Sequence, residues 1–153
     1  TKEYFNELMR ISKNQIIWGG NYMTKFLEPK SSWLIWDKVQ PEEFSMSMAE
    51  LAWSSFDSPI KIFKKVAKGG FLTNGTIDHR IHPTQKPVTL YKWLLDKYAK
   101  QNDKILDTHL GSGSISIACH DYGFDLTACE LDKEYFDKAI ERIKNHVSQQ
   151  KLF

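Results

Sequence analysis

Short apolar runs and polar turns alternate through the first part of the chain. The runs predict strands at 15–18, 32–37, 49–54 and 60–63, and a helical spacing of apolar side chains predicts a helix over 3–12. Residues 64–82 show no clear period, so we expect a loop or an irregular insertion there.

The second half of the chain alternates helical and extended patterns. Apolar side chains at helical spacing predict helices over 88–100, 113–122 and 133–147, and the first of these follows Pro87, which suits a helix start. Apolar runs predict strands at 104–107 and 125–130. Strands that alternate with helices favour an α/β fold with a parallel sheet.

Composition limits the classes of protein only loosely. The 153 residues suffice for one domain, and a net charge of +2 neither requires nor excludes nucleic acid. No apolar run is long enough to span a membrane. The two cysteines, Cys119 and Cys129, are predicted to be buried free thiols of a cytoplasmic protein, and no Cys/His spacing fits a metal site.

One stretch has the residues of a cofactor site. The run 105–107 ends in Asp107, a Gly-rich turn follows to Ser114, and the next predicted strand ends in Glu130. Glycines let a backbone approach a ligand, and a carboxylate can accept two hydrogen bonds from a ribose diol. This layout is typical of a nucleotide cofactor at the carboxyl edge of a parallel sheet, although a tight structural turn would share the Gly pattern.

These segments resemble a known enzyme family, the amino-group DNA methyltransferases, which methylate adenine N6 or cytosine N4 with S-adenosylmethionine. Residues 107–114 resemble the family's Asp-Pro-Phe-x-Gly-Ser-Gly-Thr motif, and residues 82–87 match its His-Pro-Thr-Gln-Lys-Pro segment. Residues 129–136 resemble the motif that holds the ribose. Residues 14–22, 33–38 and 49–56 resemble phage-type members, so the likeness covers nearly the whole chain.

The resemblance implies a Rossmann-like methyltransferase sheet in one domain, in the permuted order that places the catalytic segment before the cofactor segment. It implies that S-adenosylmethionine binds to Asp107, Thr108, His109, Gly111, Ser112, Gly113, Ser114 and Glu130, with Thr84, Gln85 and Lys86 at the methionine end. Residues 57–81 would form a short target-recognition loop on double-stranded DNA. Asn21 and Tyr22 would touch the flipped base and Lys64 and Lys65 the phosphates, although an aromatic turn and a solvated loop explain these residues equally well.

The family's catalytic tetrad, Asp/Asn/Ser-Pro-Pro-aromatic, does not occur in the chain, so we expect no catalytic residue within it. Asp57-Ser58-Pro59-Ile60 is the nearest string, and Thr108 and His109 replace the usual Pro and Phe. The family's tetrad ends a strand between those at 15–18 and 104–107, so we expect an incomplete sheet. A second copy, a separate polypeptide or a segment upstream of Thr1 would fill the gap.

Two functions follow from these observations. The first is methylation of DNA within restriction-modification, with adenine N6 as the expected target. The second is a catalytically inactive remnant that binds cofactor or DNA. A nicotinamide oxidoreductase is disfavoured, because its fingerprint requires a smaller residue than Ser116 and would not include the segment 82–87. The tail 149–153 has the Gln-x-x-Leu-Phe form of peptides that dock on sliding clamps, although a frayed helix end is the alternative.

Overall fold

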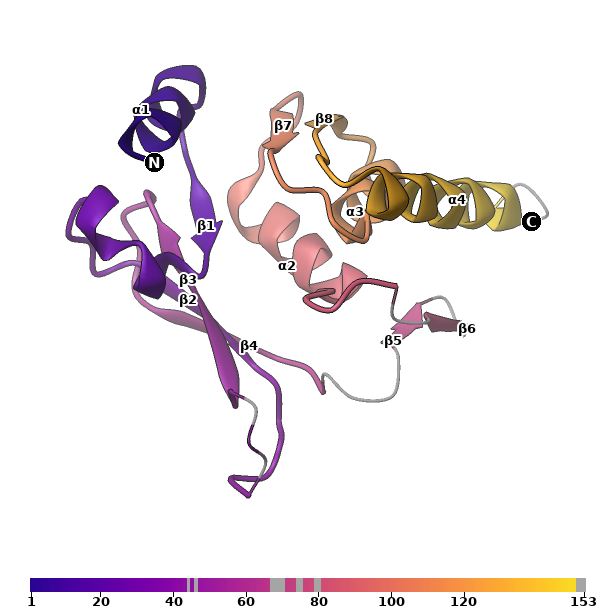
Figure 1. Cartoon of the computed structure of the whole chain (residues 1–153), viewed down its shortest axis with the longest axis horizontal. Helices are drawn as coiled ribbons and strands as arrows, with labels where there is room; N and C mark the ends of the chain where they lie inside the picture. The colour runs from indigo at the N-terminus through magenta and orange to yellow at the C-terminus, as the bar shows by residue number, and fades with distance from the viewer. Residues whose placement is uncertain (44, 46, 67–70, 74–75, 79–80, 151–153) are drawn as a thin grey trace. The chain divides into compact units, whose positions relative to one another are not determined.

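The computed structural model describes residues 1–43, 45, 47–66, 71–73, 76–78 and 81–150, with side chains left undescribed at 71–73, 76–78 and 150. The backbone divides into two compact units, Thr1–Val66 and Ala67–Phe153, and we describe each by itself (Figure 1).

The first unit is a helix and a four-stranded sheet. Its strand order is β1-β3-β2-β4, with β3 antiparallel to both of its neighbours and β2 parallel to β4. The elements are α1 (Lys2–Ile11), β1 (Ile16–Trp18), β2 (Trp33–Asp37), β3 (Ala49–Ser54), β4 (Lys61–Lys64) and two short 3-10 helices, η1 (Gly20–Tyr22) and η2 (Thr24–Phe26).

Aromatic side chains form the core of this unit. Phe5 of α1 stacks on Phe26 with ring centroids 5.0 Å apart, and Trp53 is buried with them. The Trp53 indole N–H donates to the carbonyl of Glu28 at 2.8 Å, which ties β3 to the segment after η2. A Cβ on Gly20 would lie 2.7 Å from the Cβ of Trp53, so glycine is required for η1 to pack against β3.

The second unit contains a parallel strand pair and three helices. Strands β7 (Lys104–Asp107) and β8 (Asp125–Ala128) pair in parallel through the connecting helix α3 (Ser114–Tyr122). Helices α2 (Val88–Tyr98) and α4 (Lys133–Gln150) both contact α3 (Figure 1). The core of buried apolar side chains consists of Val88, Leu95, Ile117, Ala118 and Cys119.

A buried acid connects the three helices of this unit. Asp121 of α3 pairs with Lys92 of α2 at 2.6 Å and with His146 of α4 at 2.6 Å. The side chains of Asp121 and His146 are only 7% and 8% exposed, so Lys92 and His146 take the place of water around the carboxylate. This group of contacts fixes the helices around α3 and therefore supports the turn that leads into it.

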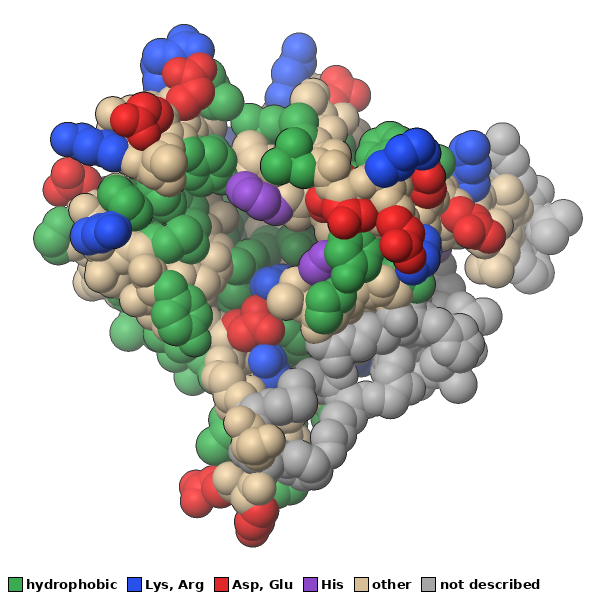
Figure 2. Space-filling view, viewed as in Figure 1, with side chains coloured by type: hydrophobic (Ala, Val, Ile, Leu, Met, Phe, Trp, Pro, Cys, Tyr) green, Lys and Arg blue, Asp and Glu red, His purple; other side chains and the backbone are tan. Residues whose placement is uncertain are grey.

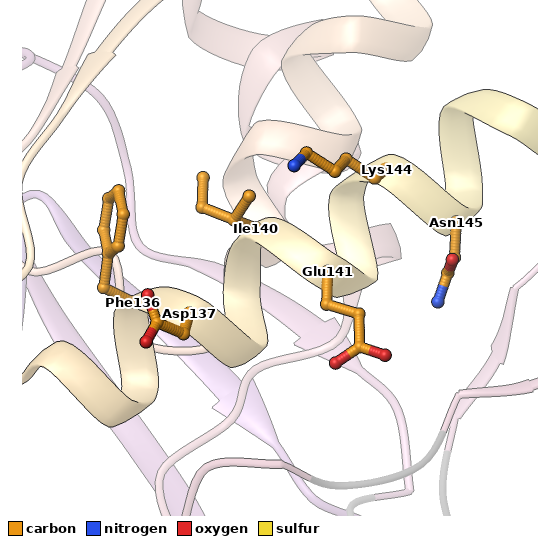
Figure 3. Close-up of a pocket in the computed structure, with 6 residues that line it drawn as sticks. All are labelled: Phe136, Asp137, Ile140, Glu141, Lys144 and Asn145. Atoms are coloured by element: carbon orange, nitrogen blue, oxygen red, sulfur yellow. The ribbon is translucent and has the colours of Figure 1, made fainter.

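The surface of α4 is charged and carries one shallow depression. Lys133 pairs with Asp137 at 2.6 Å one turn later, and Lys138 pairs with Glu134; red and blue side chains are mixed over this helix (Figure 2). The depression lies on a single face of the helix, lined by Phe136, Asp137, Ile140, Glu141, Lys144 and Asn145 (Figure 3). Within the described part of the chain, no helix is long and apolar enough to cross a membrane.

The structure confirms the predicted helices and strands to within a few residues, and it corrects one segment. The expectation of a loop over 64–82 is wrong, because β5 (Phe71–Thr73) and β6 (Thr76–Asp78) pair as an antiparallel hairpin within it. The predicted parallel sheet is confirmed for β7 and β8. The sheet is partial, as expected, since the described strands fall into three separate sheets.

Candidate cofactor site

The Gly turn connects the end of β7 to the start of α3. Gly111 and Gly113 have left-handed φ angles of +54° and +73°, which favour glycine at both positions. The Gly113 N–H donates to the Leu110 carbonyl at 3.0 Å, and Gly113 is the N-cap of α3. The turn therefore brings its own backbone and the N-terminus of a helix to the carboxyl end of the strand pair, where the predicted cofactor residues meet.

Backbone hydrogen bonds join this turn to the end of β8. Cys129 N–H donates to the Asp107 carbonyl at 2.9 Å, and Leu110 N–H donates to the Cys129 carbonyl at 2.9 Å. These two bonds place Glu130 beside the turn. The sequence predicted this meeting of two strand ends, and the structure shows it.

Glu130 is held by backbone amides. Its Oε2 accepts from Gly111 N–H at 2.7 Å, and its Oε1 accepts from Asp132 N–H at 3.1 Å. The Asp132 amide, with that of Gly111, lowers the pKa of Glu130, so the side chain is a carboxylate at neutral pH. Each oxygen has two lone pairs, so two further hydrogen bonds, such as those from a ribose diol, can be accepted.

Asp107 is half-buried at the end of β7. Burial raises its pKa, although the backbone N–H of His109, which donates to Oδ1 at 3.0 Å, acts in the opposite direction. Thr108 Oγ1 lies 2.9 Å from His109 Nδ1, so these two side chains contact one another at the mouth of the turn. A carboxylate whose ionisation is costly is a candidate for contact with a positively charged ligand.

Ser112 and Ser114 are buried behind the turn. Their hydroxyls lie 3.2 Å apart, and Arg142 of α4 donates to the Ser112 carbonyl at 2.6 Å and to the Ser114 hydroxyl at 3.0 Å. The Ser112 carbonyl and the Ser114 hydroxyl therefore hold the turn to α4. The prediction that the two serines belong to the cofactor site stays a prediction.

The segment before α2 turns sharply. The buried Gln85 accepts from Ile81 N–H at 2.9 Å through its side chain, while its own N–H donates to the His82 carbonyl at 3.1 Å. Thr84 is exposed, and Lys86 lies close enough to Asp107 for its charge to lower the pKa of that acid. Gln85 thus shapes the segment, and the prediction that Thr84, Gln85 and Lys86 lie at the methionine end stays a prediction.

Three residues of this region were absent from the predicted site. His82 lies beside Gly111, and its ring centroid is 4.3 Å from that of Tyr135. Arg142 holds the turn from behind. The sequence offered a signal for His82 and Tyr135, since both fall inside the segments that resemble family motifs. Arg142 has no local signal, because its partners lie about thirty residues earlier in the chain.

The residues predicted to contact DNA lie in the first unit. Asn21 and Tyr22 are exposed on η1, and the Tyr22 side chain is 85% exposed. Lys64 lies 3.9 Å from Asp37, and the Lys65 carbonyl accepts from the Trp36 indole at 2.9 Å. Their roles remain predictions, as does the role of 57–81, which includes residues outside the described part of the chain. The tail 151–153 also lies outside it.

A parallel strand pair, a Gly turn and an acid at the second strand end define an α/β protein that can hold a nucleotide-like cofactor. The chain belongs to the DNA methylase family of N6 and N4 methyltransferases, because the family model, described as DNA methylase, matches residues 5–141. The resemblance to amino-group DNA methyltransferases is thereby confirmed at the level of the family.

Individual relatives match shorter stretches. The chain is 34% identical over 62 residues to the type II methyltransferase M.HpaI of Haemophilus parainfluenzae. The aligned stretch is 40% of this chain and 20% of that protein. It is 34% identical over 62 residues to the type II methyltransferase M2.LlaDCHI of Lactococcus lactis subsp. cremoris, 40% of this chain and 23% of that protein. The matches thus span about a fifth of the length of these relatives.

Solved structures support the fold. The crystal structure of the M1.HpyAVI–SAM complex has a TM-score of 0.67 and 23% identity, covering 92% of this chain and 81% of that chain. M1.HpyAVI alone has a TM-score of 0.55 and 20% identity, covering 86% and 72%. The predicted Rossmann-like methyltransferase architecture is therefore confirmed.

Proposed function

We propose that the chain is the methyl-donor-binding part of an S-adenosylmethionine-dependent DNA methyltransferase that acts on an exocyclic amine. The observation that carries this proposal is Glu130, an ionised side chain joined to the Gly turn through the Gly111 N–H. Membership of the DNA methylase family and the similarity in fold to M1.HpyAVI in its complex with SAM support the same cofactor.

The residues present fit this cofactor. The second lone pair on each Glu130 oxygen suits a ribose hydroxyl. Asp107, which is half-buried, suits a positively charged ligand. When bound, S-adenosylmethionine supplies an electrophilic methyl group; this chain's residues bind and orient the donor.

We further propose that the acceptor is a base of double-stranded DNA, and that adenine N6 is the first base to test, with cytosine N4 as the alternative. A base amine is a weak nucleophile, and the family tetrad that presents it does not occur in residues 1–153. A second copy or another segment that brings a tetrad would complete the enzyme. Thr108 and His109, which replace the family's usual Pro and Phe, favour the second candidate, a remnant that binds the cofactor without transferring the methyl group.

Binding of S-adenosylhomocysteine, measured by isothermal titration calorimetry, tests the cofactor. We expect the chain to bind it and Glu130→Gln to bind at least tenfold more weakly, because an amide nitrogen cannot accept the hydroxyl that a carboxylate oxygen accepts. Glu141→Ala, which removes an exposed carboxylate of α4, is the matched control and should bind as the wild type does. Equal affinity of wild type and Glu130→Gln would remove Glu130 from the site.

Methyl transfer to DNA separates the two candidates. The chain and labelled S-adenosylmethionine are incubated with DNA, with and without the segment encoded upstream of Thr1, and the modified nucleoside is identified by mass spectrometry. N6-methyladenine or N4-methylcytosine would establish the enzyme and its base. Tight binding without transfer in either form would establish the remnant.

A further inference from the structure

His82 lies beside two parts of the candidate site. A Cβ on Gly111 would make van der Waals contact with three atoms of the imidazole, at 3.8 Å, so the ring faces the glycine of the turn. The same ring lies against Tyr135 in the first turn of α4, at a centroid distance of 4.3 Å and a tilt of 60°. Both side chains are half-buried. The imidazole therefore lies between the Gly turn and α4.

Thr84 fixes the orientation of this ring. The Thr84 backbone N–H donates to His82 Nδ1 at 3.2 Å, and its hydroxyl lies 3.1 Å from the same atom. The orientation of the ring is thereby set by a residue two positions later in the chain.

His82 also acts on Glu130. A positive charge on His82 would lower the pKa of Glu130, although the amides of Asp132 and Gly111 contribute more, so the imidazole lies within electrostatic reach of the carboxylate. Asp132 in turn accepts from Tyr135 N–H at 3.0 Å, which fixes the backbone of the residue that carries the second ring. The same few residues thus hold the imidazole, Gly111 and the carboxylate together.

We propose that His82 is a positioning residue for the cofactor. Its ring lies beside Gly111 and against Tyr135 and keeps the Gly111 N–H on Glu130 Oε2, so that the carboxylate keeps the orientation in which it receives the ribose hydroxyls. This inference rests on the proposed function. It assigns to His82 an effect on ribose recognition through Glu130, and no contact with the reacting atoms.

The test compares two ligands, S-adenosylhomocysteine and its 2′-deoxyribose analogue, in calorimetric titrations. For the wild type we expect the analogue to bind at least tenfold more weakly, because a hydroxyl bond to a carboxylate is lost. In His82→Ala the ratio of the two dissociation constants should fall to near one. A role limited to stability would weaken both ligands equally and leave the ratio unchanged, and that result would overturn the proposal.

Two further variants keep the test decisive. His82→Phe retains a ring against Gly111 and Tyr135 but loses the Thr84 anchor, so its ratio should lie between those of wild type and His82→Ala. It also replaces His82→Ala if that variant does not fold. His120→Ala removes an exposed imidazole of α3 and should keep the wild-type ratio. If His82→Phe, and His82→Ala where it folds, keep the wild-type ratio of the two dissociation constants, the proposal is contradicted.

A measurement without ligand separates this inference from the proposed function. Hydrogen exchange of the Gly111 amide, followed by NMR, should be at least tenfold faster in His82→Ala or His82→Phe than in wild type or His120→Ala, because the bond to Glu130 opens more often. Unchanged exchange would refute the positioning role. Failure of the wild type to bind S-adenosylhomocysteine would instead refute the proposed function, and with it the effect on ribose recognition.

Discussion

Gly113 and Gly123 form a matched pair for measuring how tightly the cofactor turn packs against α4. Both have φ of +73°, at the two ends of α3. A Cβ on Gly113 would lie 3.0 Å from Ile143 Cδ1 and 3.3 Å from Ala139 Cβ, whereas a Cβ on Gly123 would meet nothing within 4 Å. Substitution by alanine therefore imposes the same backbone strain at both positions and a packing conflict at only one.

The magnitudes follow from this difference. Left-handed φ costs an alanine about 1–2 kcal/mol, and the smaller entropy of the unfolded alanine chain offsets part of that cost at both positions. Overpacking adds roughly 1–3 kcal/mol at Gly113 alone. We therefore expect the free energy of unfolding to fall about 1–3 kcal/mol further in Gly113→Ala than in Gly123→Ala.

Native-state hydrogen exchange of the α3 amides measures this difference in the free energy of unfolding. The α3 amides report on the second unit, so unfolding of the first unit does not interfere. Adding Ile143→Val to Gly113→Ala removes the methyl group that lies at 3.0 Å, so the double variant should recover part of the loss beyond the separate cost of Ile143→Val. Equal destabilisation by the two glycine substitutions would show that α4 does not pack against the turn as described.

Three more predictions follow from burial and chemistry. Burial raises the pKa of Asp107, so the folded chain holds this proton more tightly than the unfolded chain does, and stability present below pH 3.8 is lost as pH rises through the raised pKa. Asp107→Asn should therefore raise the melting temperature at pH 7, and the gain should shrink as the pH is lowered toward 3.8. A gain that does not depend on pH would contradict this prediction. Burial raises the pKa of Cys119 to about 11, so a thiol reagent at pH 8 should label the exposed Cys129 alone until denaturant is added, as peptide mass spectrometry would show. Gly20→Ala should lower the free energy of unfolding by about 1–3 kcal/mol, because the new methyl group would lie 2.7 Å from Trp53. Urea unfolding followed by tryptophan fluorescence measures the change, and an unchanged midpoint would show that the contact is absent.

The sequence predicted the elements well where a period repeats over a whole element. The run 105–107 predicted β7, and the helical spacing after Gly113 predicted α3. The hairpin of β5 and β6 was missed because each strand is only three residues long, too short for a period to show. The Asn-Gly pair at 74–75 in the sequence was the available signal, since such pairs favour tight hairpins.

The site was less predictable than the fold, because its geometry depends on contacts between distant residues. Motif position predicts Ser112 and Ser114 at the cofactor, and the structure adds that Arg142 binds the Ser112 carbonyl and the Ser114 hydroxyl, a contact whose distance along the chain hides it from any local pattern. Gln85 was predicted at the methionine end, and the structure uses its side chain to close a turn. A motif indicates which residues meet, but the direction of each side chain depends on the packing around it.

The contact of Arg142 with the Ser112 carbonyl has a consequence for the chain as it is made. The two residues are 30 positions apart, so the ribosome completes the turn well before it adds the guanidinium that holds it. At roughly 5–20 residues per second, that interval lasts about 1.5–6 s. During it the nascent turn lacks its support from α4, and we expect the nascent chain to gain affinity for the cofactor only after this last helix has emerged.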